Sequence, residues 1–168
     1  MKKIVFALIA LVLTAAFAAC LACTGKPSEP ATTEGAASPD LTAADVYSAA
    51  NAVSGFGTMT AVPKADLSDI YGIDASKVAD YAWYVSENPS LNADEIAVFK
   101  LADASYANEL KGICEARIAR QLSVAETYSP DEAGKLQNAS VTVAGSFVYY
   151  CVGSASDAMT NAIAELVK

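Results

Sequence analysis

The stretch that decides the fold is Val141-Thr-Val-Ala-Gly-Ser-Phe-Val-Tyr-Tyr-Cys-Val152. Two runs of strand-forming residues flank Ala144-Gly145-Ser146, and this pattern predicts a β-hairpin. The second run, Phe147–Val152, is apolar at every position. Such a run is typical of a central strand, whose second face would be covered by the first helix or by a partner.

Two more strands are predicted upstream of the hairpin. Asp94–Leu101 is rich in strand-forming residues and gives a clear strand. Val78–Val85 also fits helical spacing, but we interpret it as a strand because aromatic and β-branched residues dominate it. Asn88-Pro89 lies between the two segments and indicates a turn.

Helices are predicted from capping signals and from apolar residues at helical spacing. Thr42 and Asp45 match a capping box, and Gly55 is placed to end that helix. Asp103 is placed to cap a long helix, which Ser129-Pro130 stops. The four predicted helices begin near Thr42, Ala65, Asp103 and Ser154.

The order of these elements predicts a single α+β domain over residues 41–168. Strands paired through short turns, with helices between the pairs, indicate a mainly antiparallel sheet of about four strands. We expect the helices to pack mostly on one face of this sheet. A segment of this length is sufficient for one domain with its own hydrophobic core.

The first forty residues differ in character from the rest. Lys2-Lys3 precede an apolar run, Ile4–Phe17, that would make a helix of ~21 Å, shorter than the ~30 Å hydrocarbon core of a bilayer. We therefore predict residues 1–19 to be a signal peptide. Residues 20–40 are rich in Pro, Thr and Ser, and we expect them to form a disordered tether.

The end of the apolar run resembles a bacterial lipobox. Ala18-Ala19-Cys20 would place a diacylglycerol on Cys20, although Phe17 stands where Leu is usual. Cys23 is the less favoured site, because Cys20 would then occupy the position that prefers Leu. The predicted address is the outer face of the bacterial cytoplasmic membrane, with the membrane as partner through the lipid on Cys20. The alternative is a cleaved signal and a soluble secreted protein.

Charge and composition exclude several functions. The chain has 11 Lys+Arg and 19 Asp+Glu, a net charge of −8, and loses two lysines with the signal. Such an acidic surface disfavours a nucleic-acid partner. The chain contains no histidine, which removes Ser-His-Asp and Cys-His catalysis and histidine-ligated zinc.

No catalytic residue, cofactor or metal site is predicted. Asp66, Asp69 and Asp74 lack the alternating spacing of a calcium loop. Asp94 and Glu95 are adjacent on a strand and point to opposite faces, so we interpret them as solvated strand-edge charges.

A candidate binding patch combines aromatic and arginine side chains. Core packing is the default for aromatic residues on strands, but an open sheet face would expose them to a partner. Arginines three apart on the long helix could clamp a carboxylate or phosphate, although pairing with Glu115, Glu126 or another acidic residue is the commoner outcome. The patch comprises Tyr81, Trp83, Tyr149, Tyr150, Arg117 and Arg120.

Cys114 and Cys151 are the two remaining cysteines. An exported protein permits a disulfide between them. Two buried thiols that pack in the core are the favoured alternative.

Five segments carry a resemblance to a known family, in the same order along the chain: Tyr71–Asp74, Ala93–Lys100, Arg117 near Gln121, Tyr128–Pro130, and Asn138–Val141 with Gly145–Val148. They resemble the bacterial family of domain of unknown function 4358, mostly predicted lipoproteins. The family usually has Gly-Asn-Tyr where this chain has Gly145-Ser146-Phe147. The resemblance implies a lipid-anchored α+β domain and brings no activity, substrate or catalytic residue.

We therefore expect a lipid-anchored, extracytoplasmic, non-enzymatic domain that binds an unknown protein or small-molecule partner. One alternative is an enzyme or enzyme accessory of the cell envelope that uses carboxylates or Arg117 in a cleft. Another is a structural envelope protein whose only requirement is its anchor.

Overall fold

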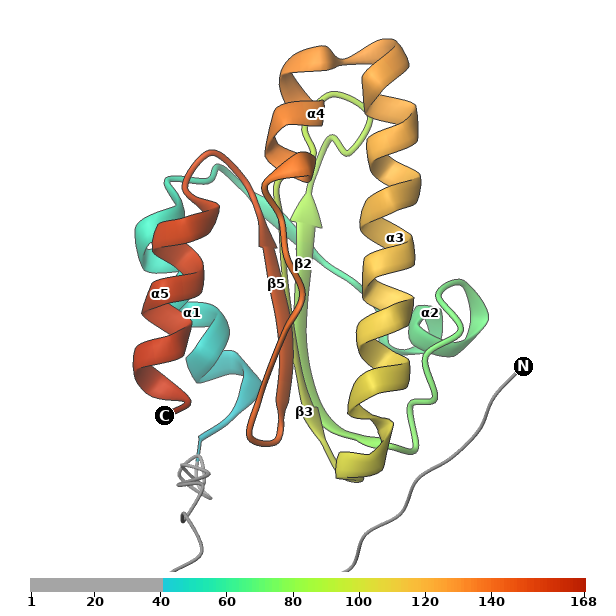
Figure 1. The fold of residues 1–168 in the computed structure, drawn as a ribbon, viewed down its shortest axis with the longest axis vertical. Helices are drawn as coiled ribbons and strands as arrows, with labels where there is room; N and C mark the ends of the chain where they lie inside the picture. Colours follow the sequence, from blue (N-terminus) through green and yellow to red (C-terminus); the bar gives the residue numbers. More distant parts are fainter. Residues whose placement is uncertain (1–40) are drawn as a thin grey trace, which may run out of the picture. The chain divides into compact units, whose positions relative to one another are not determined.

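The computed structural model of the chain describes residues 41–168 (Figure 1). The predicted signal peptide, the lipidation of Cys20 or Cys23, and the tether lie outside these residues. The helices are α1 Ala43–Ser54, α2 Lys64–Asp69, the 3-10 helix η1 Ala104–Tyr106, α3 Ala107–Tyr128, α4 Pro130–Gln137 and α5 Ser156–Leu166. The strands are β1 Met59–Ala61, β2 Val78–Ser86, β3 Glu95–Leu101, β4 Thr142–Ala144 and β5 Phe147–Val152.

The strands form an antiparallel sheet in the order β1-β2-β3-β5-β4. The predicted α+β class, the hairpin and both upstream strands are confirmed. The sheet described here has five strands, one more than predicted, because three-residue β1 is too short to show a periodic pattern. Gly145 adopts φ 54° in the hairpin turn, a left-handed conformation that suits glycine.

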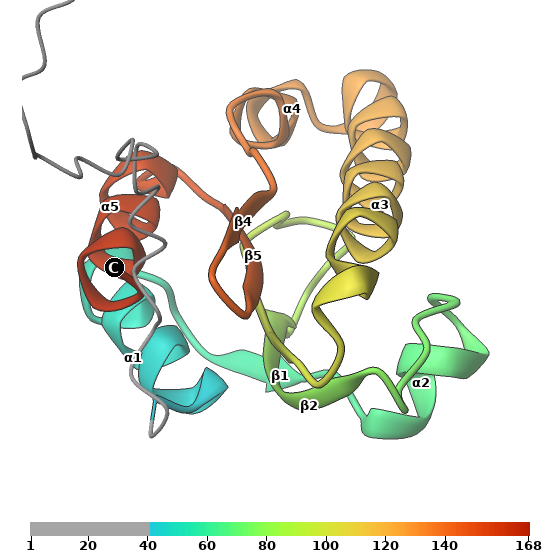
Figure 2. The ribbon, with the colours of Figure 1, turned by 60° about the horizontal axis from the view of Figure 1, so that its bottom comes forward.

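Helices cover both faces of the sheet, which corrects the expectation that they pack mostly on one face. Helices α1 and α5 lie against one face, and α2, α3 and α4 lie on the other (Figure 2). The physical reason is that β3 and β5 are apolar on both sides, so each face must be buried. We expected either the first helix or a partner to cover the second face of the central strand. The structure shows the first helix, α1, on that face, together with α5.

Local capping signals account for α1. The Thr42 hydroxyl accepts a hydrogen bond from the Asp45 amide at 3.1 Å, and the Asp45 carboxylate accepts from the Thr42 amide at 3.0 Å. Gly55 ends the helix at φ 68°. The predicted capping box and C-terminal glycine are therefore confirmed.

Helix α4 was not predicted. Ser129-Pro130 does end α3, as expected, but Pro130 also begins α4 at its first turn. Proline is favoured at that position because its missing N–H would have no helical partner there. The buried Ala133 and Leu136 fix α4 against the sheet, next to the C-terminal end of α3.

Candidate functional site

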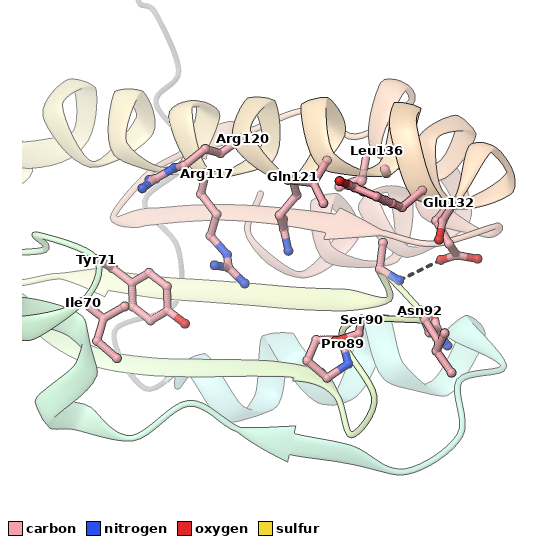
Figure 3. Close-up of a pocket in the computed structure, with 16 residues that line it drawn as sticks. Ile70, Tyr71, Pro89, Ser90, Asn92, Arg117, Arg120, Gln121, Glu132 and Leu136 are labelled. Carbon is pink, nitrogen blue, oxygen red and sulfur yellow. Dashed lines mark hydrogen bonds between the residues drawn. The ribbon is translucent and has the colours of Figure 1, made fainter.

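One face of α3 lines a groove of about 460 Å³. Side chains at intervals of three and four residues share this face of the helix. They are Arg117, Arg120, Gln121, Val124, Ala125 and Tyr128. Figure 3 shows Arg117 and Gln121 pointing from α3 toward the sheet.

Three other segments complete the groove. Pro89–Ala93, in the turn between β2 and β3, lies across from α3 (Figure 3). Ile70 and Tyr71 follow α2, whereas Glu132 and Leu136 belong to α4. The unpredicted helix α4 therefore contributes directly to this site.

The rim of the groove is apolar. Among residues 41–168, seven large hydrophobic side chains are exposed, and four of them line the groove: Ile70, Leu91, Val124 and Tyr128. Tyr128 is 80% exposed. Exposed hydrophobic side chains that gather at a concave surface, rather than scatter, typically mark a ligand or partner site.

A buried carboxylate lies behind the arginine end of the groove. Glu95 is only 1% exposed. Arg117 donates to it from Nε and Nη2, each at 2.8 Å. Trp83 Nε1 donates at 2.6 Å, Gln121 Nε2 donates at 3.2 Å, and the Tyr150 hydroxyl also donates. These five hydrogen bonds occupy both carboxylate oxygens.

The register of the sheet brings these donors together. Trp83 and Tyr150 flank Ala97 on the two neighbouring strands. Glu95 lies two positions before Ala97, so it points to the same face of the sheet. Because Ala97 has only a methyl group, the two larger side chains have room to reach Glu95.

Aromatic rings hold the Arg117 guanidinium in place. It lies 4.9 Å from the ring centroids of both Tyr71 and Trp83. Burial opposes the charge of Arg117, but the hydrogen bonds and charge of Glu95 outweigh it and raise the pKa of Arg117. Burial, with the Glu95 charge, raises the pKa of Tyr150, which therefore remains a neutral donor.

Some polar groups at the groove have no partner among residues 41–168. Arg120 is exposed and makes no ion pair or hydrogen bond there. Arg117 uses Nε and Nη2, which leaves Nη1 without a protein partner in this region. Gln121 Oε1 is buried and accepts no hydrogen bond, a situation that costs ~1–3 kcal/mol. The arginines thus offer donors at one end of the groove.

An ion cluster holds the turn at the other end. Lys135 Nζ lies 2.9 Å from carboxylate oxygens of both Asp94 and Glu132, and 3.2 Å from the Asn92 side-chain oxygen. Glu132 also accepts from the Ala93 amide at 2.7 Å (Figure 3). These contacts fix the turn between β2 and β3 to α4 and so set the width of the groove.

The predicted aromatic patch is wrong as an exposed surface. Trp83, Tyr149 and Tyr150 are buried, because helices cover both faces of the sheet. Tyr149 belongs to the face opposite Trp83 and Tyr150. Tyr81 is half-buried and donates its hydroxyl to the Val62 carbonyl at 3.0 Å. The other two members, the arginines of α3, do line the groove.

The expected pairing with an acidic residue is confirmed for Arg117. Its partner is Glu95 of β3, an acid other than the two on its own helix, Glu115 and Glu126. The interpretation of Glu95 as a solvated strand-edge charge is wrong, because the α3 layer covers that face of β3. Asp94 is nearly buried as well and pairs with Lys135.

Sequence reasoning also missed most of the groove. A usable signal existed, since the α3 stripe continues Arg117 and Arg120 at helical spacing to Val124 and Tyr128. No comparable signal pointed to Leu91, whose position depends on a turn.

The two cysteines of the domain are free thiols. Cys114 packs on the α3 side of the sheet and Cys151 on the α1 side. The disulfide alternative is therefore contradicted, and the favoured buried thiols are confirmed. Burial raises the pKa of each thiol to about 12.

The acidic side chains at the groove are already engaged by protein donors. Glu95 has both oxygens engaged, so it is poorly placed to take a proton from a bound molecule. Between residues 41 and 168 no group of three or more acidic or cysteine side chains is arranged to hold a metal ion. No helix in that same part of the chain is long and apolar enough to cross a bilayer.

Fold and site together define a three-layer α+β domain in which a groove joins an apolar rim to an arginine-bearing end. The chain belongs to the family described as domain of unknown function (DUF4358), whose model matches residues 52–153. This match confirms the family resemblance, and the family's description assigns no activity. No curated protein and no solved structure matched the chain. Every groove-lining residue lies within the matched segment, whereas α5 and most of α1 lie outside it.

Proposed function

We propose that this chain is a lipid-anchored, extracytoplasmic bacterial domain that binds a ligand or partner, without catalysis, in the groove beside α3. The observation that carries the proposal is the gathering of exposed hydrophobic side chains around that groove. A rim of this kind gains free energy by leaving water, at ~25 cal/mol per Å² of apolar surface buried. The acidic surface elsewhere disfavours nucleic acid and anionic membrane surfaces as the bound species.

The lipid anchor rests on the sequence around Cys20. Mass spectrometry of the mature N-terminal peptide tests it directly. We expect a diacylglyceryl group on Cys20 as the first residue. An unmodified thiol at Cys20, or a lipid on Cys23, would overturn the assignment.

The binding role is tested by crosslinking from within the groove in intact cells. A photoreactive phenylalanine analogue at Leu91 should give an adduct that the same analogue at Val53 does not, because Val53 is exposed on α1. Val124→Asp should abolish the Leu91 adduct by placing a charge in the apolar rim. Equal adducts at both positions, or none at Leu91, would contradict the proposal.

Two other functions have less support from the geometry of the groove. An enzyme or enzyme accessory would use carboxylates or Arg117 in a cleft, but the Nε and Nη2 donors of Arg117 are committed to Glu95. A structural envelope protein that needs only its anchor leaves the apolar rim without a role. Domain replacement distinguishes the structural envelope protein from the other functions. A lipobox fused to an unrelated domain should replace this protein in the cell only if the anchor alone is required.

A further inference from the structure

The groove has two chemically different ends. Arg117 and Arg120 lie near Tyr71 at one end, and these three also line a second, much smaller recess. Toward the other end, Leu91, Val124 and Tyr128 form the apolar walls. A ligand that satisfies both ends must be amphipathic.

The charge at the arginine end selects an anionic head group. Arg117 is neutralised by Glu95, whereas Arg120 has no acidic partner among residues 41–168. Glu132, the acidic residue of the groove lining, is on α4 and is paired with Lys135. The donors that remain are Arg120 and Nη1 of Arg117, which suit an anion with two acceptor oxygens.

The length of the groove bounds the apolar part. Arg120 and Tyr128 are separated by eight residues of α3, or ~12 Å at ~1.5 Å per residue. An extended chain of single bonds advances roughly 1.2 Å per bond, so a hydrocarbon chain of about ten carbons would span that distance. A volume of about 460 Å³ is within the usual range for small-molecule sites.

This inference rests on the proposed binding role. We propose that the groove binds a free amphipathic carboxylate, one with an apolar chain of medium length. Its carboxylate is bound by Arg120, with Nη1 of Arg117 as second donor. Its chain lies along α3 against Val124, Leu91 and Tyr128. Arg117 remains paired with Glu95. Glu95 is therefore a positioning residue, because its buried carboxylate holds the Arg117 guanidinium in the floor of the groove.

The chain contains one tryptophan, which provides the assay. Trp83 is buried beneath the Arg117 guanidinium, so its fluorescence reports on a molecule bound above it. The probe is decanoate, titrated into the purified full chain. Decanol tests the need for the charge, and acetate tests the need for the apolar chain.

We expect saturable decanoate binding that is at least tenfold tighter than decanol or acetate binding. Arg120→Gln should weaken decanoate binding about tenfold and leave decanol unchanged, as expected for loss of one charge-assisted hydrogen bond. Val124→Asp should weaken decanoate and decanol alike. Val53→Asp is the matched control and should leave every affinity unchanged.

Three results would overturn the inference. Equal affinity for decanol and decanoate would show that the head group is not recognised. Binding to phosphatidylglycerol vesicles with the same dependence on Arg120 would identify a lipid head group instead of a free carboxylate. Absence of decanoate binding, with the Leu91 adduct still formed, would reject this ligand class and leave the proposed binding role standing. Loss of the Leu91 adduct is the separate result that rejects the binding role itself.

Discussion

Arg117 and Glu95 lie 22 residues apart in the chain and are joined by two parallel hydrogen bonds of 2.8 Å. The pair connects α3 to β3 at the floor of the groove. Burial removes most of the water that would otherwise solvate either charge, so each residue depends on the other.

Glu95→Gln removes the negative charge at nearly constant volume. The Arg117 guanidinium would then be buried without a counter-ion, and we expect the free energy of unfolding to fall by about 3–5 kcal/mol. Urea denaturation followed by circular dichroism measures this change.

Glu115→Gln is the matched control for that substitution. Glu115 pairs with Lys111 at 3.6 Å, and both side chains are exposed, so its loss should cost at most ~1 kcal/mol. Comparable losses of unfolding free energy for Glu95→Gln and Glu115→Gln would show that the buried pair stabilises the fold no more than an exposed ion pair does. Adding Arg117→Met to Glu95→Gln should recover part of the loss, because no unpaired charge then remains.

Stability should fall at alkaline pH because of the two buried thiols. The pKa of Cys114 and of Cys151 rises from 9.0 to about 12 on folding, with burial as the largest cause. Between these values the unfolded thiol has ionised and the folded thiol has not. The stabilisation is therefore complete below about pH 9 and is lost as the pH rises toward 12.

The double variant Cys114→Ala, Cys151→Ala isolates that effect. From pH 8 to pH 10 the wild-type chain should lose ~1 kcal/mol more per thiol than the variant. The comparison uses the change between the two pH values for each protein, so the packing cost of the substitutions cancels. Parallel pH profiles would contradict the prediction.

Gly153 leaves no room for a side chain. A Cβ at this position would overlap Phe56 Cζ and lie 3.2 Å from Met159 Cε. Gly153→Ala should therefore displace the Phe56 ring and lower stability by about 1–3 kcal/mol. Gly57→Ala serves as control, since a Cβ there meets nothing within 4 Å. Calorimetry measures the midpoint of thermal unfolding for each variant. Equal shifts for Gly153→Ala and Gly57→Ala would contradict the close approach of Phe56 to Gly153.

Lys135→Met should loosen the turn that forms one wall of the groove. Burial opposes the charge of Lys135, but its hydrogen bonds to Asp94 and Glu132 prevail and raise its pKa. Without the ammonium group these two carboxylates repel each other. We expect faster hydrogen exchange in residues 87–93 and unchanged exchange in β5. Lys111→Met, on the exposed face of α3, should change neither.

The sequence predicted elements whose signals are local and missed those that depend on distant neighbours. The α1 cap and the hairpin lie within a few residues of their signals, and both were found. Helix α4 is not predicted because Ser129-Pro130 is a strong signal for the end of one helix, whereas the same proline also begins the next. Burial of Glu95 was missed because it requires Arg117, which a different element supplies.

The same distinction applies to the groove. Arg117 and Arg120 were identified as a candidate anion site from their spacing on one helix. The facing wall, around Leu91, is fixed by the contacts of Lys135 more than forty residues later in the chain. Only the three-dimensional arrangement of the turn, α3 and α4 reveals that these residues enclose one site.

The sheet order has a consequence for the folding pathway. Strands β1, β2 and β3 are consecutive neighbours, and β4 and β5 form a hairpin, but the β3–β5 seam joins two halves separated by α3 and α4. Glu95 lies on one side of that seam and Tyr150 on the other. An intermediate in which the β4–β5 hairpin has not docked lacks the Tyr150 donor, so the hydrogen bonds to Glu95 are complete only after the two halves have joined. We therefore expect the halves to dock late, in a transition state of high contact order.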